Sequence, residues 1–430
     1  MGYRRAMPLI YLIAGEQSGD QLGARLMRAI RRRRPDATFA GVGGTAMAAE
    51  GCASLFPMSD LSLMGFLEVL PRLRHLKRRI RETADDIAAK RPDVVVTIDS
   101  PGFTLRVLRA IAALGIPRAH YVAPQVWAWR EGRVKHYPGL WERLLCLLPF
   151  EPAFFARHDL PATFVGHPVL ESGCDTGDAT RFRARHNLAP DDRVVIVMPG
   201  SRRGEVKRLL PILRATLERL REPVVPVVPL AGPVAEAVTE ATRAWSRRPI
   251  LISDSADKHD AFAAAAAALT KSGTSTLELA LAGVPMVVTY RANPVTIWIF
   301  KRLARVKYAS LVNLLSGREI VPELLQGDAT PEKLAAALEK ILTPEGAAAQ
   351  RAAFAAPLAM LRAPGVAPAG WPADTPEGTP TGGLEGATKG TLEGTPSGLD
   401  GETPRGTPSD AAAATVLDLI EQSARHHPGA

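Results

Sequence analysis

The stretch from Leu269 to Tyr290, LTKSGTSTLELALAGVPMVVTY, predicts a strand, a tight turn, a helix and a second strand in succession. Small side chains and free N–H groups open the helix at the positive end of its dipole, which suits a diphosphate, at Ser272, Gly273, Thr274 and Ser275. Glu278 lies about one turn further, where its carboxylate could bind both hydroxyls of a ribose. The stretch predicts a nucleotide site, although a capped helix without a ligand has the same pattern.

Length and charge limit the class of protein. The chain has 430 residues, enough for two domains, and a formal net charge of +9. Basic residues cluster at 31–34, 72–81 and 301–307, so we expect an anionic partner, although each cluster can also be a solvated helix face. The three cysteines have no metal-site spacing, and no segment is long and apolar enough to span a membrane. The sequence favours a soluble α/β protein of the cytoplasm.

Apolar runs in the first half predict buried parallel strands at 8–14, 38–43, 92–98, from 116, and at 144–148. A loop with two glycines and polar side chains follows the first strand, with Glu16, Ser18, Gly19 and Asp20 as candidate acceptor-site residues. An ordinary helix N-terminus would explain this loop equally well. Glycine-rich turns after successive strands favour a doubly wound sheet.

Asp99 stands at the carboxyl end of the strand that ends at Ile98, just before Ser100, Pro101 and Gly102. Ligands of open α/β sheets bind outside the carboxyl ends of the strands, so Asp99 is the candidate general base. An aspartate before Ser-Pro can also cap a turn or a helix.

The segment HYVAPQVWAWR, from His120 to Arg130, gathers aromatic rings and a cation in one loop. Stacking faces and a guanidinium suit a sugar or a lipid phosphate, and the candidates are His120, Gln125, Trp127 and Trp129. The alternative is a tight loop packed on core aromatics.

The second half begins with a strand at 194–198, followed by Pro199 to Glu205, in which Arg202 could pair with a phosphate. Further strands are expected at 224–229 and 250–253, and a helix at 331–342. The basic amphipathic stretch at 293–311 can lie on an anionic bilayer or pack on the domain, and the apolar stretch at 61–70 allows acyl-chain contact or core packing.

Taken together, GEQSGD, GVGG, LMGFLEVLP, Asp99, HYVAPQVWAWR, VGHP, MPGSRRGE, KSGTSTLELALAGVPMVV and NLLSGRE resemble the lipid-A-disaccharide synthase family over residues 8–342. The resemblance implies the GT-B fold, with two Rossmann-like domains facing a cleft. It implies an inverting transfer from UDP-2,3-diacylglucosamine to lipid X, a diacylglucosamine 1-phosphate, in which Asp99 is the base and no metal or other cofactor takes part. Arg202, the 272–274 turn and Glu278 would bind UDP, and polar donor-site residues would lie at Asn313, Arg318 and Glu319.

The domain boundaries expected from the resemblance and from composition are an acceptor-binding domain at 1–170, a linker at 171–192 and a nucleotide-sugar domain at 193–345. A helical crossover at 346–363, a Pro/Gly/Thr-rich disordered segment at 364–410 and a terminal helix at 411–425 follow. Expected partners are the two lipid substrates and an anionic inner-membrane surface on which the enzyme docks peripherally, as a monomer or homodimer, without nucleic acid.

The chain departs from the family pattern after Asp99, where the run is Ser-Pro-Gly-Phe-Thr in place of Ala-Pro-Asp-Phe-Asn, and at Gln17 and Gln125. A mechanism that needs a second carboxylate there is therefore in doubt. The alternatives are another GT-B enzyme, such as a glycosyltransferase of peptidoglycan lipid intermediates or a UDP-N-acetylglucosamine 2-epimerase, and a non-catalytic nucleotide- or RNA-binding protein. The epimerase would not need acyl-binding surfaces, and the aromatics are few for an RNA-binding face.

Overall fold

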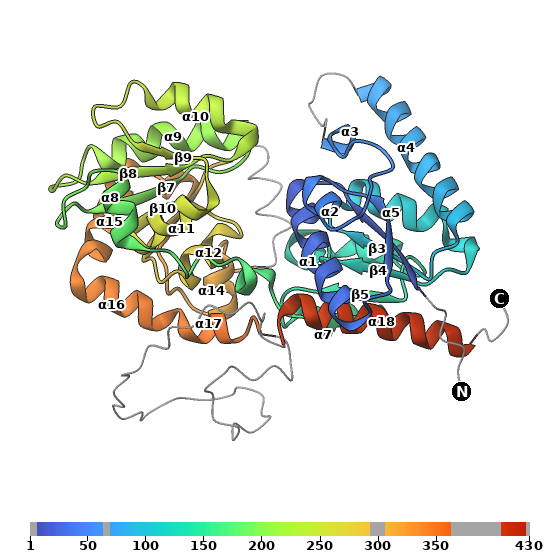
Figure 1. Ribbon diagram of the computed structural model, residues 1–430. Coiled ribbons are helices and arrows are strands. Elements are labelled where there is room, and N and C mark those ends of the chain that lie inside the picture. Colours follow the sequence, from blue (N-terminus) through green and yellow to red (C-terminus); the bar gives the residue numbers. More distant parts are fainter. Residues whose placement is uncertain (1–6, 63–68, 293–305, 363–405, 427–430) are drawn as a thin grey trace, which may run out of the picture.

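The computed structural model describes residues 7–62, 69–292, 306–362 and 406–426. The chain forms two halves side by side, the N-terminal half in blue to cyan and the C-terminal half in green to orange (Figure 1). Each half contains one sheet of six parallel strands. The predicted α/β class with two doubly wound sheets is confirmed.

The N-terminal sheet has the strand order β2-β1-β3-β4-β5-β6. Its strands are β1 (Leu9–Ala14), β2 (Thr38–Val42), β3 (Val94–Ile98), β4 (Arg118–Tyr121), β5 (Arg143–Cys146) and β6 (Ala162–Phe164). The helices of this half are α1 (Gln17–Arg33), α2 (Thr45–Ala49), α3 (Ser59–Ser62), α4 (Val69–Lys90), α5 (Pro101–Ala110), α6 (Val126–Trp129) and α7 (Glu151–Ala156), with 3₁₀ turns η1 (Ala112–Leu114), η2 (Glu131–His136) and η3 (Pro168–Glu171).

Strand β1 shows why its sequence is apolar throughout. Successive side chains of a strand point to opposite faces of the sheet. Ile10 and Leu12 pack in one core cluster with α1, whereas Tyr11 and Ile13 pack in another with α5. Both faces of the sheet are therefore covered, as a parallel sheet requires.

The C-terminal sheet repeats this plan with the strand order β12-β11-β10-β7-β8-β9. Its strands are β7 (Val194–Met198), β8 (Val225–Pro229), β9 (Ile250–Ile252), β10 (Ala265–Lys271), β11 (Met286–Tyr290) and β12 (Glu323–Leu325). Its helices are α8 (Ala179–Arg185), α9 (Arg203–Leu217), α10 (Ala235–Thr242), α11 (Ser255–Ala264), α12 (Ser275–Leu281), α14 (Leu311–Ser316), α15 (Pro331–Leu342), α16 (Pro344–Ala353) and α17 (Ala355–Ala359), with 3₁₀ turns η4 (Gly232–Val234) and η5 (Gln326–Asp328).

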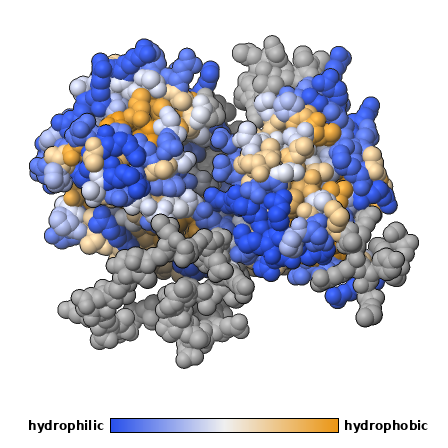
Figure 2. Space-filling model, viewed as in Figure 1, coloured by the Kyte–Doolittle hydropathy of each residue, from blue (hydrophilic) through white to orange (hydrophobic). Residues whose placement is uncertain are grey.

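The last helix, α18 (Pro408–His426), returns to the N-terminal half (Figure 1). Its buried Ala412, Ala413 and Val416 belong to the same core cluster as α1 and β1. An ion pair between Arg32 and Asp410, 2.8 Å apart, joins the two helices. Figure 2 shows hydrophilic residues on the lower part of the N-terminal half, next to the C-terminal half, with hydrophobic residues beside them.

Three features differ from the sequence-based expectations or lie outside them. The expected linker at 171–192 contains α8, which the Arg181–Asp260 ion pair, 2.5 Å long, fixes to α11. Strands β6 and β12 were not predicted; each is only three residues long, too short for an alternating pattern. The stretches 61–70 and 293–311 fall mostly outside the described residues.

Candidate active site

The strand order of the N-terminal sheet reverses direction between β1 and β3. Ligands of doubly wound folds bind at such a switch point, outside the carboxyl ends of the two strands. The loop after β1 begins at Gly15, and the loop after β3 begins at Asp99. The loops touch, because a Cβ atom added at Gly15 would lie 2.5 Å from Oγ of Ser100. The structure thus brings the first glycine loop and the candidate base together.

Asp99 has an unusual backbone. Its φ is 48° and that of Ser100 is 47°, so two successive non-glycine residues adopt the left-handed conformation. The hydroxyl of Thr104 donates to the Asp99 carbonyl oxygen at 2.7 Å and helps to hold this turn. Burial raises the pKa of the Asp99 carboxyl, and the Ser100 N–H opposes this effect. Local strain and a carboxylate of increased basicity are both typical of a catalytic position.

The glycine loop after β1 divides into exposed and buried candidates. Glu16 and Ser18 are exposed, whereas Gly19 and Asp20 are buried. The Asp20 carboxylate accepts hydrogen bonds from the backbone N–H groups of Gly44, Ala46 and Met47 at 2.7, 2.9 and 3.0 Å. Asp20 therefore anchors the start of α2, and of the four candidates Glu16 and Ser18 are the ones with polar side chains exposed to solvent.

His120 lies inside the N-terminal half. Its Nδ1 is 2.7 Å from the Thr97 hydroxyl, and its ring stacks on Trp141 with centroids 5.5 Å apart. Complete burial lowers the pKa of His120 to about 3, so the ring is neutral near pH 7. This placement agrees with the alternative of a loop packed on core aromatics.

The rest of the loop after β4 reaches the surface. Gln125 is exposed, and Trp129 is partly buried under the Arg130 guanidinium, 3.8 Å from the ring centroid. Trp127 is buried, donates from Nε1 to Oε1 of Glu151 at 3.0 Å, and meets Phe150 edge-on with centroids 4.8 Å apart.

A pocket of about 500 Å³ lies between the two halves, beside Trp127. It is lined by Trp127, Phe150, Ala153, Phe154, Arg157, Val306 and Leu314. The N-terminal residues follow β4 and β5, and the other two follow β11. Segments that follow strands of both sheets therefore line this cavity, which we call the interdomain pocket.

The C-terminal sheet has its own switch point, between β7 and β10. Arg202 follows β7 with a side chain that is 79% exposed, and Lys271 ends β10. Oε1 of the buried Glu205 lies 3.4 Å from Arg202 Nη1 and 3.3 Å from Lys271 Nζ. Glu205 thus holds two cations beside the predicted diphosphate turn.

The turn after β10 begins with Ser272, whose hydroxyl donates to the Ala309 carbonyl oxygen at 2.6 Å. Gly273 and Thr274 follow, and their carbonyl oxygens accept the N–H groups of Thr276 and Leu277 at 3.1 and 3.0 Å. Glu278 lies in the first turn of α12, where Oε2 is 3.1 Å from Nζ of Lys258.

Asn313 is fully buried and satisfied by protein groups. Its amide nitrogen donates to the Val321 carbonyl oxygen and to Glu323, both at 2.8 Å, and its oxygen accepts from the N–H groups of Ile320 and Val321. This side chain has no capacity left for a ligand. Arg318 and Glu319 are exposed in the loop that leads to β12.

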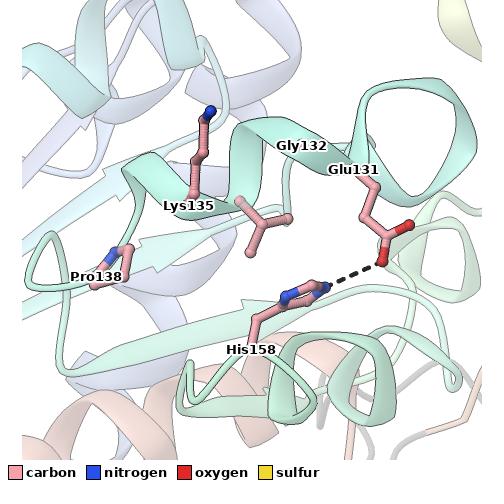
Figure 3. Close-up of a pocket in the computed structure, with 6 residues that line it drawn as sticks. Glu131, Gly132, Lys135, Pro138 and His158 are labelled. Carbon is pink, nitrogen blue, oxygen red and sulfur yellow. Dashed lines mark hydrogen bonds and ion pairs between the residues drawn. The ribbon is translucent and has the colours of Figure 1, made fainter.

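A second pocket of about 460 Å³ lies on the N-terminal half, beyond Phe154 (Figure 3). His158 points at Glu131, with Nε2 3.2 Å from Oε1, and the Lys135 side chain points away from both.

No helix in the described ranges is long and apolar enough to cross a membrane. The same ranges contain no group of three or more His, Cys, Asp or Glu side chains that could hold a metal ion.

Four residues of these sites were not among the site residues predicted from the sequence: Gly15, Glu151, Glu205 and Lys271. Lys271 had a signal, since it ends an apolar strand directly before the Ser-Gly-Thr turn. Glu205 had a weaker one, because Glu at the third helical position is half of a capping box. The contact of Gly15 with Ser100 and that of Glu151 with Trp127 join loops that are distant in sequence, and the sequence carries no sign of them.

Comparison with known proteins agrees with this architecture. A family model described as lipid-A-disaccharide synthetase matches residues 10–355. The lipid-A-disaccharide synthase of Granulibacter bethesdensis is 58% identical over 367 residues, covering 83% of this chain and 93% of that protein. The enzyme of Gluconobacter oxydans is 56% identical over 418 residues, covering 96% and 91%.

Solved structures share the fold at low sequence identity. The UDP-GlcNAc 2-epimerase of Neisseria meningitidis, bound to UDP-GlcNAc, has a TM-score of 0.56 at 12% identity, covering 82% of this chain and 96% of that one. The calicheamicin glycosyltransferase CalG4 has a TM-score of 0.51 at 15% identity, covering 83% and 95%. The two sheets therefore form the GT-B fold, and with the family match over most of its length the chain belongs to the lipid-A-disaccharide synthase family of glycosyltransferases.

Proposed function

We propose that this enzyme transfers diacylglucosamine from UDP-2,3-diacylglucosamine to the 6-hydroxyl of lipid X, with inversion at the anomeric carbon. Asp99 takes the proton of the 6-hydroxyl as its oxygen attacks that carbon. The bond from the anomeric carbon to the UDP oxygen breaks, and UDP leaves with the electron pair. The observation that carries the proposal is the position of Asp99 at the N-terminal switch point, where its backbone is left-handed and burial raises the pKa of its carboxyl.

The C-terminal switch point supplies the donor site in this proposal. Arg202 and Lys271 offset the charge that develops on the leaving diphosphate. In the turn at Ser272, Gly273 and Thr274, the Ser272 N–H donates to the Thr289 carbonyl oxygen at 3.1 Å, so Gly273 and Thr274 are the candidate N–H donors. Glu278 is the candidate for the ribose hydroxyls. Asn313 acts indirectly, because it fixes the segment from Ser310 to Glu323.

The acceptor site belongs to the N-terminal half in the same proposal, with Glu16 and Ser18 as its exposed polar side chains. Peripheral contact with an anionic membrane remains a prediction. The exposed Arg74, Lys77, Arg78 and Arg81 of α4 favour it, and co-sedimentation with anionic liposomes is the measurement. Serine at these positions should weaken binding, and unchanged binding would place the contact elsewhere.

The test is incubation of the purified protein with UDP-2,3-diacylglucosamine and lipid X, following UDP release and the lipid product by mass spectrometry. We expect disaccharide 1-phosphate in equimolar amount with UDP. Asp99→Asn should lower kcat by about 10²–10⁴-fold while UDP binding persists, since general-base catalysis contributes that much. Near-normal turnover of Asp99→Asn would refute the role of Asp99, and no product from the wild-type protein would refute the reaction.

A further inference from the structure

The interdomain pocket is apolar on nearly every side. The rings of Trp127, Phe150 and Phe154 and the aliphatic Val306 and Leu314 form its walls. All five side chains are buried or half-buried, and Trp127 is fixed by its hydrogen bond to Glu151. The aromatic wall is therefore preformed, which reduces the entropy that a ligand loses on binding.

One charged residue, Arg157, also lines the interdomain pocket. Arg157 is exposed, and its guanidinium carbon lies 5.5 Å from the centroid of the Phe154 ring. An apolar cavity with a single guanidinium beside it suits an amphipathic ligand, whose apolar part fills the cavity and whose anionic part meets the cation. At ~30 Å³ for a group the size of water, about 500 Å³ holds roughly a dozen methylene groups or more.

We propose that the interdomain pocket binds an acyl chain of the acceptor, with Arg157 near the acceptor phosphate. The assignment rests on the proposed function, in which the acceptor is a diacylglucosamine 1-phosphate. Its 2-acyl chain and its 1-phosphate are attached to adjacent ring carbons. A single binding pose can therefore place the chain in the pocket and the phosphate beside the neighbouring cation. Five of the seven lining residues come from the N-terminal half, on which the acceptor binds in that proposal.

Helix α7 provides a matched pair of variants. Ala153 and Ala156 are both exposed on this helix, but only Ala153 lines the pocket. Ala153→Phe places a ring in the cavity without replacing a buried side chain. Ala156→Phe adds the same ring outside it and serves as the control.

The experiment measures kcat/KM for acceptors whose 2-acyl chain is shortened by two methylenes, with the donor kept constant. Each methylene removed from water strengthens binding by about fourfold, so the wild-type protein and Ala156→Phe should prefer the longer chain by roughly 15-fold. Ala153→Phe should lose this preference and bind the long-chain acceptor about tenfold or more weakly. Equal chain preference in both variants would overturn the proposal.

A binding measurement separates this proposal from the catalytic one. Isothermal titration with diacylglucosamine 1-phosphate of two chain lengths, in the presence of UDP, needs no turnover. Loss of chain preference in Ala153→Phe alone supports the pocket even if the wild-type protein forms no disaccharide. Normal disaccharide synthesis with unaltered chain preference in Ala153→Phe refutes the pocket and leaves the proposed reaction standing.

Arg157→Gln should weaken binding of the 1-phosphate compound about tenfold and leave binding of the dephosphorylated compound unchanged. Equal weakening for both compounds would refute the role of Arg157.

Discussion

Asp99 shows how a single residue depends on its neighbours. The left-handed backbone at Asp99 and Ser100 is unfavourable for non-glycine residues and persists only where the surroundings impose it. Here the constraints are the Thr104 hydroxyl, the hydrogen bond from the Asp99 N–H to the Tyr121 carbonyl oxygen at 2.9 Å, and the close approach of Gly15 to Ser100. Gly15 is needed because no Cβ atom fits beside Ser100.

We expect Gly15→Ala to reduce kcat by roughly 10²-fold, because the added methyl group would lie 2.5 Å from Oγ and 2.8 Å from Cβ of Ser100 and would displace the loop that carries Asp99. UDP binding should stay unchanged, since the proposed donor site lies in the other half. Gly232→Ala is the control, because nothing lies within 4 Å of its added Cβ atom. Wild-type kcat in Gly15→Ala would show that this contact does not position the base.

At the scale of the element, Glu151 joins two loops that are distant in sequence. It begins α7 and accepts the Trp127 Nε1–H from α6, and its other oxygen accepts the N–H groups of Leu147 and Leu148 at 3.0 Å. Glu151 is buried and its pKa is raised to about 7, chiefly by burial, while these hydrogen bonds work in the opposite direction. The aromatic wall of the interdomain pocket therefore depends on a carboxyl group that titrates near neutrality.

Glu151 should make stability depend on pH. Its folded pKa of about 7 exceeds the ordinary value of 4.5, so the folded protein binds the proton more tightly than the unfolded chain does. The resulting stabilisation is fully present below the ordinary pKa and is lost as the pH rises through about 7. Glu151→Gln removes this contribution.

Denaturant unfolding of both proteins between about pH 5 and about pH 8 checks the expectation. The difference between their free energies of unfolding should change by on the order of 2–3 kcal/mol over this range, with the wild type losing more on the alkaline side. Parallel pH profiles would contradict the assignment to Glu151.

At the scale of the whole molecule, the chain connects its two halves more than once. One apolar cluster contains Trp127 and Phe154 of the N-terminal half together with Val312 and Leu315 of the C-terminal half. Helix α18 crosses back to the N-terminal half, where Ser409 donates to Glu171 at 2.7 Å. The end of the chain thus completes the core of the half that contains its beginning.

We expect Val416→Asp to destabilise the N-terminal half by several kcal/mol, because Val416 is fully buried against α1 and a carboxylate there has no partner. Thermal unfolding should show an early transition, whereas UDP binding by the C-terminal half should persist at temperatures below the second transition. Asp418→Ala, at an exposed position of the same helix, should leave the unfolding curve unchanged. A single unshifted transition in Val416→Asp would contradict the structural role of α18.

Local pattern was enough to predict most of the fold. Strand β7 was predicted at its observed bounds, Val194–Met198, and helix α15 at Pro331–Leu342, because Thr330 caps α15 and apolar side chains recur at helical spacing. The family followed from motifs, each short and contiguous. Asp99 was placed at the carboxyl end of its strand for the same reason.

The sequence by itself determined most of the strands and the family, since periodicity and capping are properties of neighbouring residues. Only the tertiary structure decided which polar groups are free to act. Asp20 and Asn313 bond to backbone groups of other segments, Lys271 pairs with Glu205 of α9, and Gly15 matters because Ser100 lies against it. Each of these relations joins residues on different elements, and hydrogen-bond saturation and steric contact exist only once the chain has folded.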